Sequence, residues 1–100
     1  MEQLIAAGSY RAAMAMTGVI LEHSLRELAS KRDVPVRPRA AIHQLANSLQ
    51  RDGIIDINLR ATIEDVAGLL NSAVHSLDFK PTLQQAQSML EVVKRITQLI

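Results

Sequence analysis

The stretch INLRATIEDVAGLLNSAVHSLD, residues 57–78, decides the fold of this chain. Its apolar residues recur at alternating spacings of four and three, which places them on one stripe of a helix of about five or six turns. Such a stripe is expected to face a core. Beside it, Asn71 and His75 lie one helical turn apart and share a face of the helix. The stripe consists of Leu59, Ile63, Val66, Leu70, Ala73 and Leu77.

A segment before this stretch predicts a short helix and two loops. The sequence KRDVPVRPRA, residues 31–40, is expected to be an extended connector, because each proline disfavours helix at the residue before it. A helix from about residue 38 or 39 to residue 52 follows, and Gly53 is suited to the left-handed conformation that ends a helix. Asp56 is then a predicted N-cap of the organising helix.

A long first helix is predicted over residues 2–30, which contain no proline. Its apolar residues form two neighbouring stripes, so we expect it to cover two surfaces at once. One stripe consists of Met14, Leu21, Leu25 and Leu28, and the other of Ala13, Met16 and Ile20.

The last helix is predicted to begin at Thr82, because Gln85 three residues later completes a capping box. This helix also has two apolar stripes, which either face two neighbours in the bundle or face one neighbour and a dimer partner. The chain is therefore predicted to be all-α, a single domain over residues 1–100 that folds as a four-helix bundle with an up-and-down-like arrangement.

The amino-acid composition favours a helical fold and limits the kinds of partner that the protein can attract. Hydrophobic residues make up 48% of the chain and aromatic residues only 2%, which favours packed helices with an aliphatic core. The mean hydropathy of +0.10 indicates more apolar surface than one small core needs, and so predicts a partner or a homodimer. The formal net charge of +1 excludes a global field that attracts polyanions, so any contact with RNA has to be local.

Cysteine is absent, which excludes disulfides and thiolate chemistry and is compatible with a reducing compartment. No apolar run approaches the roughly twenty residues that span a bilayer. We therefore expect a cytoplasmic protein without a membrane association. The closing residues ITQLI lack a polar tail, which suggests a domain taken from a longer protein with a flanking domain or protein partner.

Asn71 and His75 are the candidate catalytic residues. An imidazole can act as general acid or base near neutral pH, and the amide can orient a phosphate or hydroxyl group. The alternative is that both are hydrogen-bonded structural groups. His23 lies one turn before Glu27, which is more typical of solvated neighbours than of a metal site, and no metal or other cofactor is expected. His43 has no obvious partner.

The basic residues of the connector, Lys31, Arg32, Arg37 and Arg39, are interrupted by Asp33 and have no interleaved aromatic residues. They fit a solvated connector better than a phosphate-binding surface.

Nearly the whole chain resembles the HEPN superfamily, a group of small all-α domains named for nucleotide binding. The resemblance rests on LEHSLRELA in the first helix, LQRDGII at the end of the second, LLNSAVHSLD at the end of the third, and KPT followed by QQAQSMLEVV in the fourth. The family often carries an Arg, a polar residue that is frequently Asn, three further residues and then His. Residues 71–75, NSAVH, match the part from Asn to His.

The Arg of this motif is missing, because Leu70 precedes Asn71. The resemblance implies a mechanism for the nuclease members of the family. In these, Arg and His from two subunits converge on RNA, where His assists proton transfer and Arg stabilises the charged transition state. The chain is accordingly interpreted as a non-catalytic interaction or RNA-binding module, dimeric, in a prokaryotic defence, toxin–antitoxin or signalling system.

Two alternatives remain open. One is an active, metal-independent ribonuclease in which His75 works with an Arg from elsewhere, and the other is a plain oligomerisation domain. Arg11, Arg26 and Lys80 are the candidate cations for RNA binding. Glu22 either pairs with His75 across the bundle or forms an exposed ion pair with Arg26 one turn away.

Overall fold

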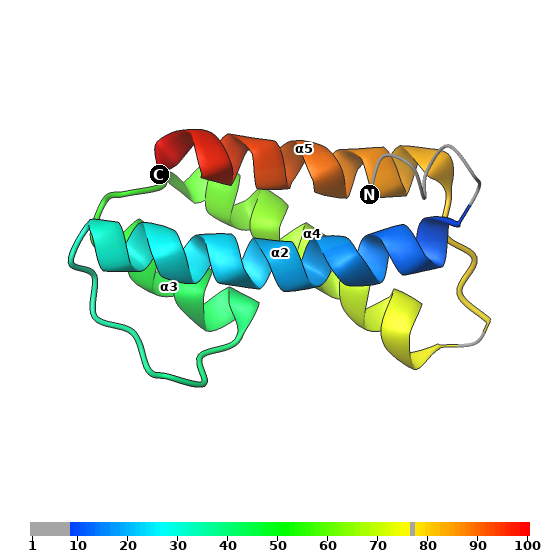
Figure 1. The fold of residues 1–100 in the computed structure, drawn as a ribbon, viewed down its shortest axis with the longest axis horizontal. Helices are drawn as coiled ribbons and strands as arrows, with labels where there is room; N and C mark the ends of the chain where they lie inside the picture. Colours follow the sequence, from blue (N-terminus) through cyan, green and yellow to red (C-terminus); the bar gives the residue numbers. More distant parts are fainter. Residues whose placement is uncertain (1–8, 77) are drawn as a thin grey trace.

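The computed structural model describes residues 9–76 and 78–100, and these contain four helices and no strand. The helices are α2 (Tyr10–Lys31), α3 (Ile42–Arg51), α4 (Ile57–His75) and α5 (Leu83–Leu99). They pack side by side around one core, so the predicted all-α four-helix bundle is confirmed (Figure 1). The part of the first predicted helix over residues 2–8, and Leu77 of the organising stripe, lie outside the described residues.

The local signals at the ends of α4 and α5 act as predicted. The N–H of Leu59 donates to Asp56 Oδ1 at 2.7 Å, so Asp56 caps α4. The N–H of Gln85 donates to Thr82 Oγ1 at 3.2 Å, and the N–H of Thr82 donates to Gln85 Oε1 at 3.1 Å, which completes the capping box of α5. Gly53 follows α3 with a φ of 77°.

Helix α3 begins at Ile42, later than the predicted start at residue 38 or 39. The connector instead makes a turn in which the N–H of Ala40 donates to the carbonyl of Arg37 at 3.1 Å. From α2, Arg26 also donates to the carbonyls of Arg37 (3.3 Å) and Ala40 (2.7 Å). These carbonyls therefore accept hydrogen bonds from a side chain on another element, a contact that cannot be predicted from the helix propensity of residues 38–41.

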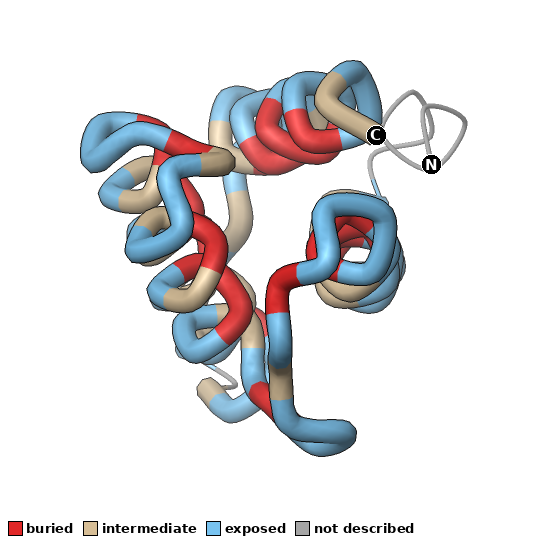
Figure 2. The backbone as a smooth tube through the Cα atoms, turned by 90° about the vertical axis from the view of Figure 1, so that its left-hand side faces the viewer, coloured by how far each residue is buried: buried red, intermediate tan, exposed pale blue. Residues whose placement is uncertain are grey.

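The core is formed by one face of each helix, as the buried positions in Figure 2 show on the sides where the helices meet. Leu59, Ile63, Val66 and Ala73 of the organising stripe are buried, and Leu70 is partly buried. In α2 only one of the two predicted stripes is fully buried: Met14, Leu21, Leu25 and Leu28.

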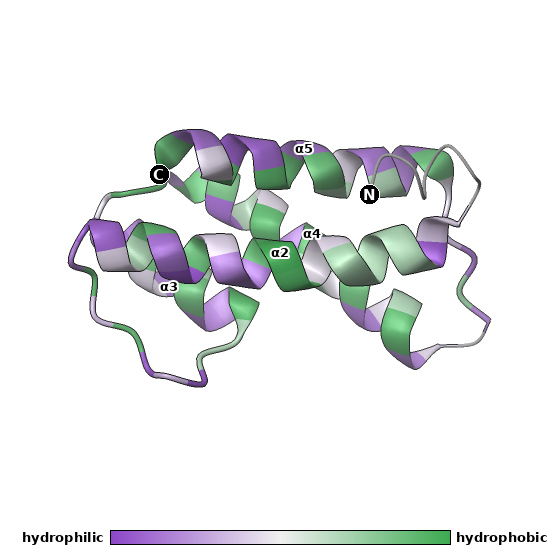
Figure 3. Cartoon of the chain, in the orientation of Figure 1, coloured by the Kyte–Doolittle hydropathy of each residue, from purple (hydrophilic) through white to green (hydrophobic). Residues whose placement is uncertain are grey.

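Helix α2 packs against α3, α4 and α5, so it covers more than one surface as predicted, but the second stripe does not provide these contacts throughout. Ala13 is buried, but Met16 and Ile20 are 48% and 38% exposed. Val19 beside them is 69% exposed, so the middle of α2 presents apolar side chains outside the core. Figure 3 shows this stretch as a strongly hydrophobic band on α2.

The helices do not simply alternate in direction, so their order differs from the predicted up-and-down-like arrangement. Figure 1 shows α2 and α5 running the same way and α4 running the opposite way. The reason is the connector over residues 32–41, which folds back along α2, where Arg26 holds it. Among the helices in the described part of the chain, none is long and apolar enough to cross a membrane.

Candidate functional site

A groove of about 790 Å³ lies between α2, the beginning of α3 and the second half of α4. Asn71 and His75 both line it, together with Val74 between them. All three are exposed, and Val74 is 56% exposed. The prediction that Asn71 and His75 share a face is confirmed, and this face borders a groove.

Small and apolar side chains form most of the groove surface. From α2 these are Ala15, Gly18 and Val19, and from α4 they are Ala67, Gly68 and Leu70. Small residues predominate on both helices, which leaves room for the groove between them. The groove is therefore an apolar channel with polar groups at a few points.

His43, for which the sequence indicates no obvious partner, also lines the groove. It is the second residue of α3, and the folded-back connector carries the start of this helix to the middle of α2. Its location thus depends on the path of the connector, for which the local sequence around His43 carries no signal. The lining of the groove thus includes two imidazoles, those of His43 and His75, and the amide of Asn71.

Two carboxylates complete the polar lining. Glu22 Oε1 lies 3.4 Å from a guanidinium nitrogen of Arg26, and Glu64 Oε1 lies 3.9 Å from Arg60 Nε. Glu22 thus forms the i,i+4 pair with Arg26, which is one of the two alternatives predicted for it. Among the described residues that line the groove, none is Lys or Arg.

Leu70 has a packing role. A Cβ built on Gly18 would lie 2.3 Å from Leu70 Cδ2 and 2.7 Å from Leu70 Cδ1. Gly18 is buried, and Leu70 of α4 occupies the space next to the α2 backbone where a side chain at residue 18 would lie. An aliphatic side chain at residue 70 therefore forms part of the contact between α2 and α4.

Arg11 stabilises the end of α4. Its guanidinium donates to the carbonyls of Ala73, Ser76 (3.3 Å) and Phe79. These carbonyls belong to the last turn of α4 and the loop after it, where the helix leaves acceptors without intrahelical partners. Arg11 does not line the groove; it lines an adjacent hollow with Val74.

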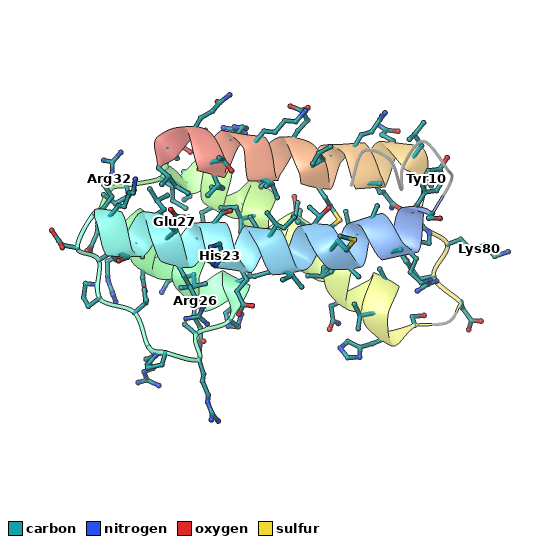
Figure 4. The ribbon with its side chains drawn as sticks, viewed as in Figure 1. Tyr10, His23, Arg26, Glu27, Arg32 and Lys80 are labelled. Carbon is teal, nitrogen blue, oxygen red and sulfur yellow. The ribbon has the colours of Figure 1, made fainter. Side chains whose placement is uncertain are left out.

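The other two predicted RNA-binding cations also lie outside the groove. Arg26 holds the connector through the contacts described above, while Lys80 is exposed in the loop before α5 and extends away from the molecule (Figure 4). These three basic residues were predicted together as candidate cations for RNA binding, but they lie in separate regions of the structure.

His23 and Glu27 lie side by side on the outer face of α2, with His23 Nε2 3.9 Å from Glu27 Oε2 (Figure 4). Their side chains are 79% and 47% exposed, as expected for solvated neighbours. Within residues 9–76 and 78–100, no group of three or more His, Asp and Glu side chains is arranged to hold a metal ion.

Comparison of the sequence with protein families matches residues 1–100 to DUF4145, described as a domain of unknown function. Comparison with curated proteins and with solved structures gives no match. Because the match extends over residues 1–100, the chain belongs to the DUF4145 family.

Proposed function

We propose that this protein is a non-catalytic, HEPN-like interaction module that binds a second copy of itself through the groove between α2 and α4. The observation that carries the proposal is the character of the groove: its surface is mainly apolar, and none of the described residues lining it is Lys or Arg. In the nuclease mechanism that the HEPN resemblance implies, an Arg stabilises the negative charge of the transition state. Leu70, at the motif position of that cation, instead packs over Gly18.

A second copy is the occupant that fits the surface. Val19 and Val74, which line the groove, are 69% and 56% exposed, and Met16, about one turn before Val19 on α2, is 48% exposed. Contiguous exposed apolar residues rimmed by polar groups are typical of protein interfaces. The groove also carries both carboxylates and imidazoles, so a two-fold arrangement can set Glu22 or Glu64 of one copy against His43 or His75 of its partner.

Analytical ultracentrifugation over a range of protein concentrations tests the proposal. We expect the parent protein to be dimeric and Val74→Glu to be monomeric, because the new carboxylate would be buried without a partner. Ile57→Glu is the matched control, since Ile57 is 65% exposed at the other end of α4 and does not line the groove. A monomeric parent, or equal dissociation by both variants, would contradict the proposal.

One observation favours a second candidate, a metal-independent ribonuclease: His43 and His75 line the same groove. Two imidazoles can serve as the base and the acid of phosphodiester cleavage. Incubation of the parent, His75→Ala and His43→Ala with structured and single-stranded RNAs, without metal, separates the candidates. Cleavage by the parent that both variants lose would favour the ribonuclease, and intact RNA in all three samples would favour the interaction module.

A further inference from the structure

A second hollow, of about 640 Å³, lies between the connector and the outward face of α3. From α3 it is lined by Gln44, Asn47, Ser48 and Arg51, whose spacing of three and four residues places them on one face of the helix. The opposite face carries the buried Leu45 and Leu49. The hollow is thus separate from the groove, to which α3 contributes Ile42 and His43.

The connector forms the other wall, and it is held in place. Arg26 donates to the carbonyls of Arg37 and Ala40, and Val34 and Ala40 are buried at 5% and 4% exposure. Pro35 and Pro38 restrict the backbone between these points. The hollow therefore exists before a ligand binds, which lowers the entropic cost of binding.

The charge of the hollow is positive. Arg37 from the connector and Arg51 from α3 are both exposed and line it, and none of the described lining residues is acidic. Asp33 and Asp52, the nearest acidic residues in the sequence, are not among the lining residues. Arginine binds carboxylates through two parallel hydrogen bonds.

The remaining lining residues suit a peptide. The amide of Asn47 can donate to and accept from an extended backbone, while Val36 and Pro38 supply apolar surface for its side chains. Single-stranded nucleic acids are typically bound by aromatic side chains on which successive bases stack. The only two aromatic residues of the chain, Tyr10 and Phe79, do not line the hollow.

We propose that this hollow binds an extended acidic segment of a partner protein, with carboxylates on Arg37 and Arg51 and the peptide backbone on Asn47. The proposal does not rest on the dimer, because no described residue lines both the hollow and the groove. It gives the protein two attachment points: one for a second copy and one for an acidic peptide.

Fluorescence anisotropy with a labelled peptide of alternating Glu and Leu, at low ionic strength, tests this inference on the full chain. We expect Arg37→Gln or Arg51→Gln to weaken binding about threefold and the double variant about tenfold, as for partly exposed charge pairs. Asn47→Ala should also weaken binding. Arg95→Gln is the matched control, because Arg95 is exposed on α5 and removes the same charge away from the hollow.

Three further probes decide the outcome. A peptide with Gln in place of Glu should not bind, and circular dichroism should show that every variant is folded. Equal weakening by Arg95→Gln would mean non-specific attraction and would overturn the proposal, as would absence of binding by the parent. Tighter binding of single-stranded oligouridine that depends on Arg37 and Arg51 would overturn the assignment to a peptide in favour of RNA.

Discussion

Leu70 of α4 packs over Gly18 of α2 so closely that a Cβ on residue 18 would lie 2.3 Å from Leu70 Cδ2. This contact joins the organising helix to the helix that lines the other side of the groove. The contact also gives a physical reason for an aliphatic side chain at residue 70. A guanidinium at residue 70 would lose the contact with Gly18 and would need its own hydrogen-bond acceptors.

Substituting Gly18 by Ala should lower the free energy of unfolding by about 1–2 kcal/mol, because overpacking outweighs the gain in helix propensity. Urea denaturation measures the effect. Gly68→Ala is the control: nothing lies within 4 Å of a Cβ at this helical position, so it should be neutral or stabilise by up to about 1 kcal/mol.

The double variant Gly18→Ala with Leu70→Ala should be less destabilised than the sum of the two single variants, by about 1 kcal/mol. The shorter side chain at residue 70 leaves room for the new methyl group. Additive losses in the double-mutant cycle would show that the two residues do not constrain each other.

Arg11→Gln should loosen the end of α4 and the loop after it. The glutamine cannot reach the carbonyls of Ala73, Ser76 and Phe79 together, so we expect a loss of about 1–2 kcal/mol in stability. Hydrogen exchange should become faster in the last turn of α4. Lys80→Gln removes the same charge from an exposed loop position and should leave both measurements unchanged.

The helices and their ends could be predicted because their signals are local. The Asp56 cap, Gly53 and the Thr82 capping box each depend on residues within one turn, and the structure contains all three. The exposure of Met16 and Ile20 could not be predicted. A wide apolar face of a helix does not indicate which part of it packs against a neighbouring helix.

The site was predicted only in part. Asn71 and His75 share a helix face by their spacing, but the approach of His43 depends on the folded-back connector. The roles of Arg11 and Arg26 could not be predicted from the sequence either. Their hydrogen-bond acceptors are backbone carbonyls, and because every residue has one, no residue type indicates the partner. The carbonyl of Ala73 is 62 residues from Arg11, and that of Ala40 is 14 residues from Arg26.

Asp56→Ala should lower the free energy of unfolding by about 1 kcal/mol, because the N–H of Leu59 loses its acceptor. Asp56→Asn retains an oxygen at the same position and should lose much less. Thermal or urea denaturation of both variants tests the cap, and equal losses would show that charge at the helix end, and not the hydrogen bond, provides the stabilisation.

Arg26→Ala should free the connector from α2. The carbonyls of Arg37 and Ala40 lose their donor, which should cost about 1–2 kcal/mol in stability and speed hydrogen exchange around Ala40. Glu22→Ala separates this effect from the ion pair: Glu22 is 44% exposed, and its loss should change stability by less than about 0.5 kcal/mol. If both variants had equal effects, the ion pair would be the important contact.

Arg26→Ala also tests whether the position of the connector matters for the hollow that is proposed to bind an acidic peptide. Arg26 does not line that hollow, yet it fixes the wall that carries Arg37. Arg26→Ala should therefore weaken binding of the Glu–Leu peptide while Glu22→Ala leaves it unchanged, because binding to a mobile wall must first order it. Unchanged peptide binding in Arg26→Ala, together with faster exchange in the connector, would show that Arg51 and Asn47 on α3 suffice.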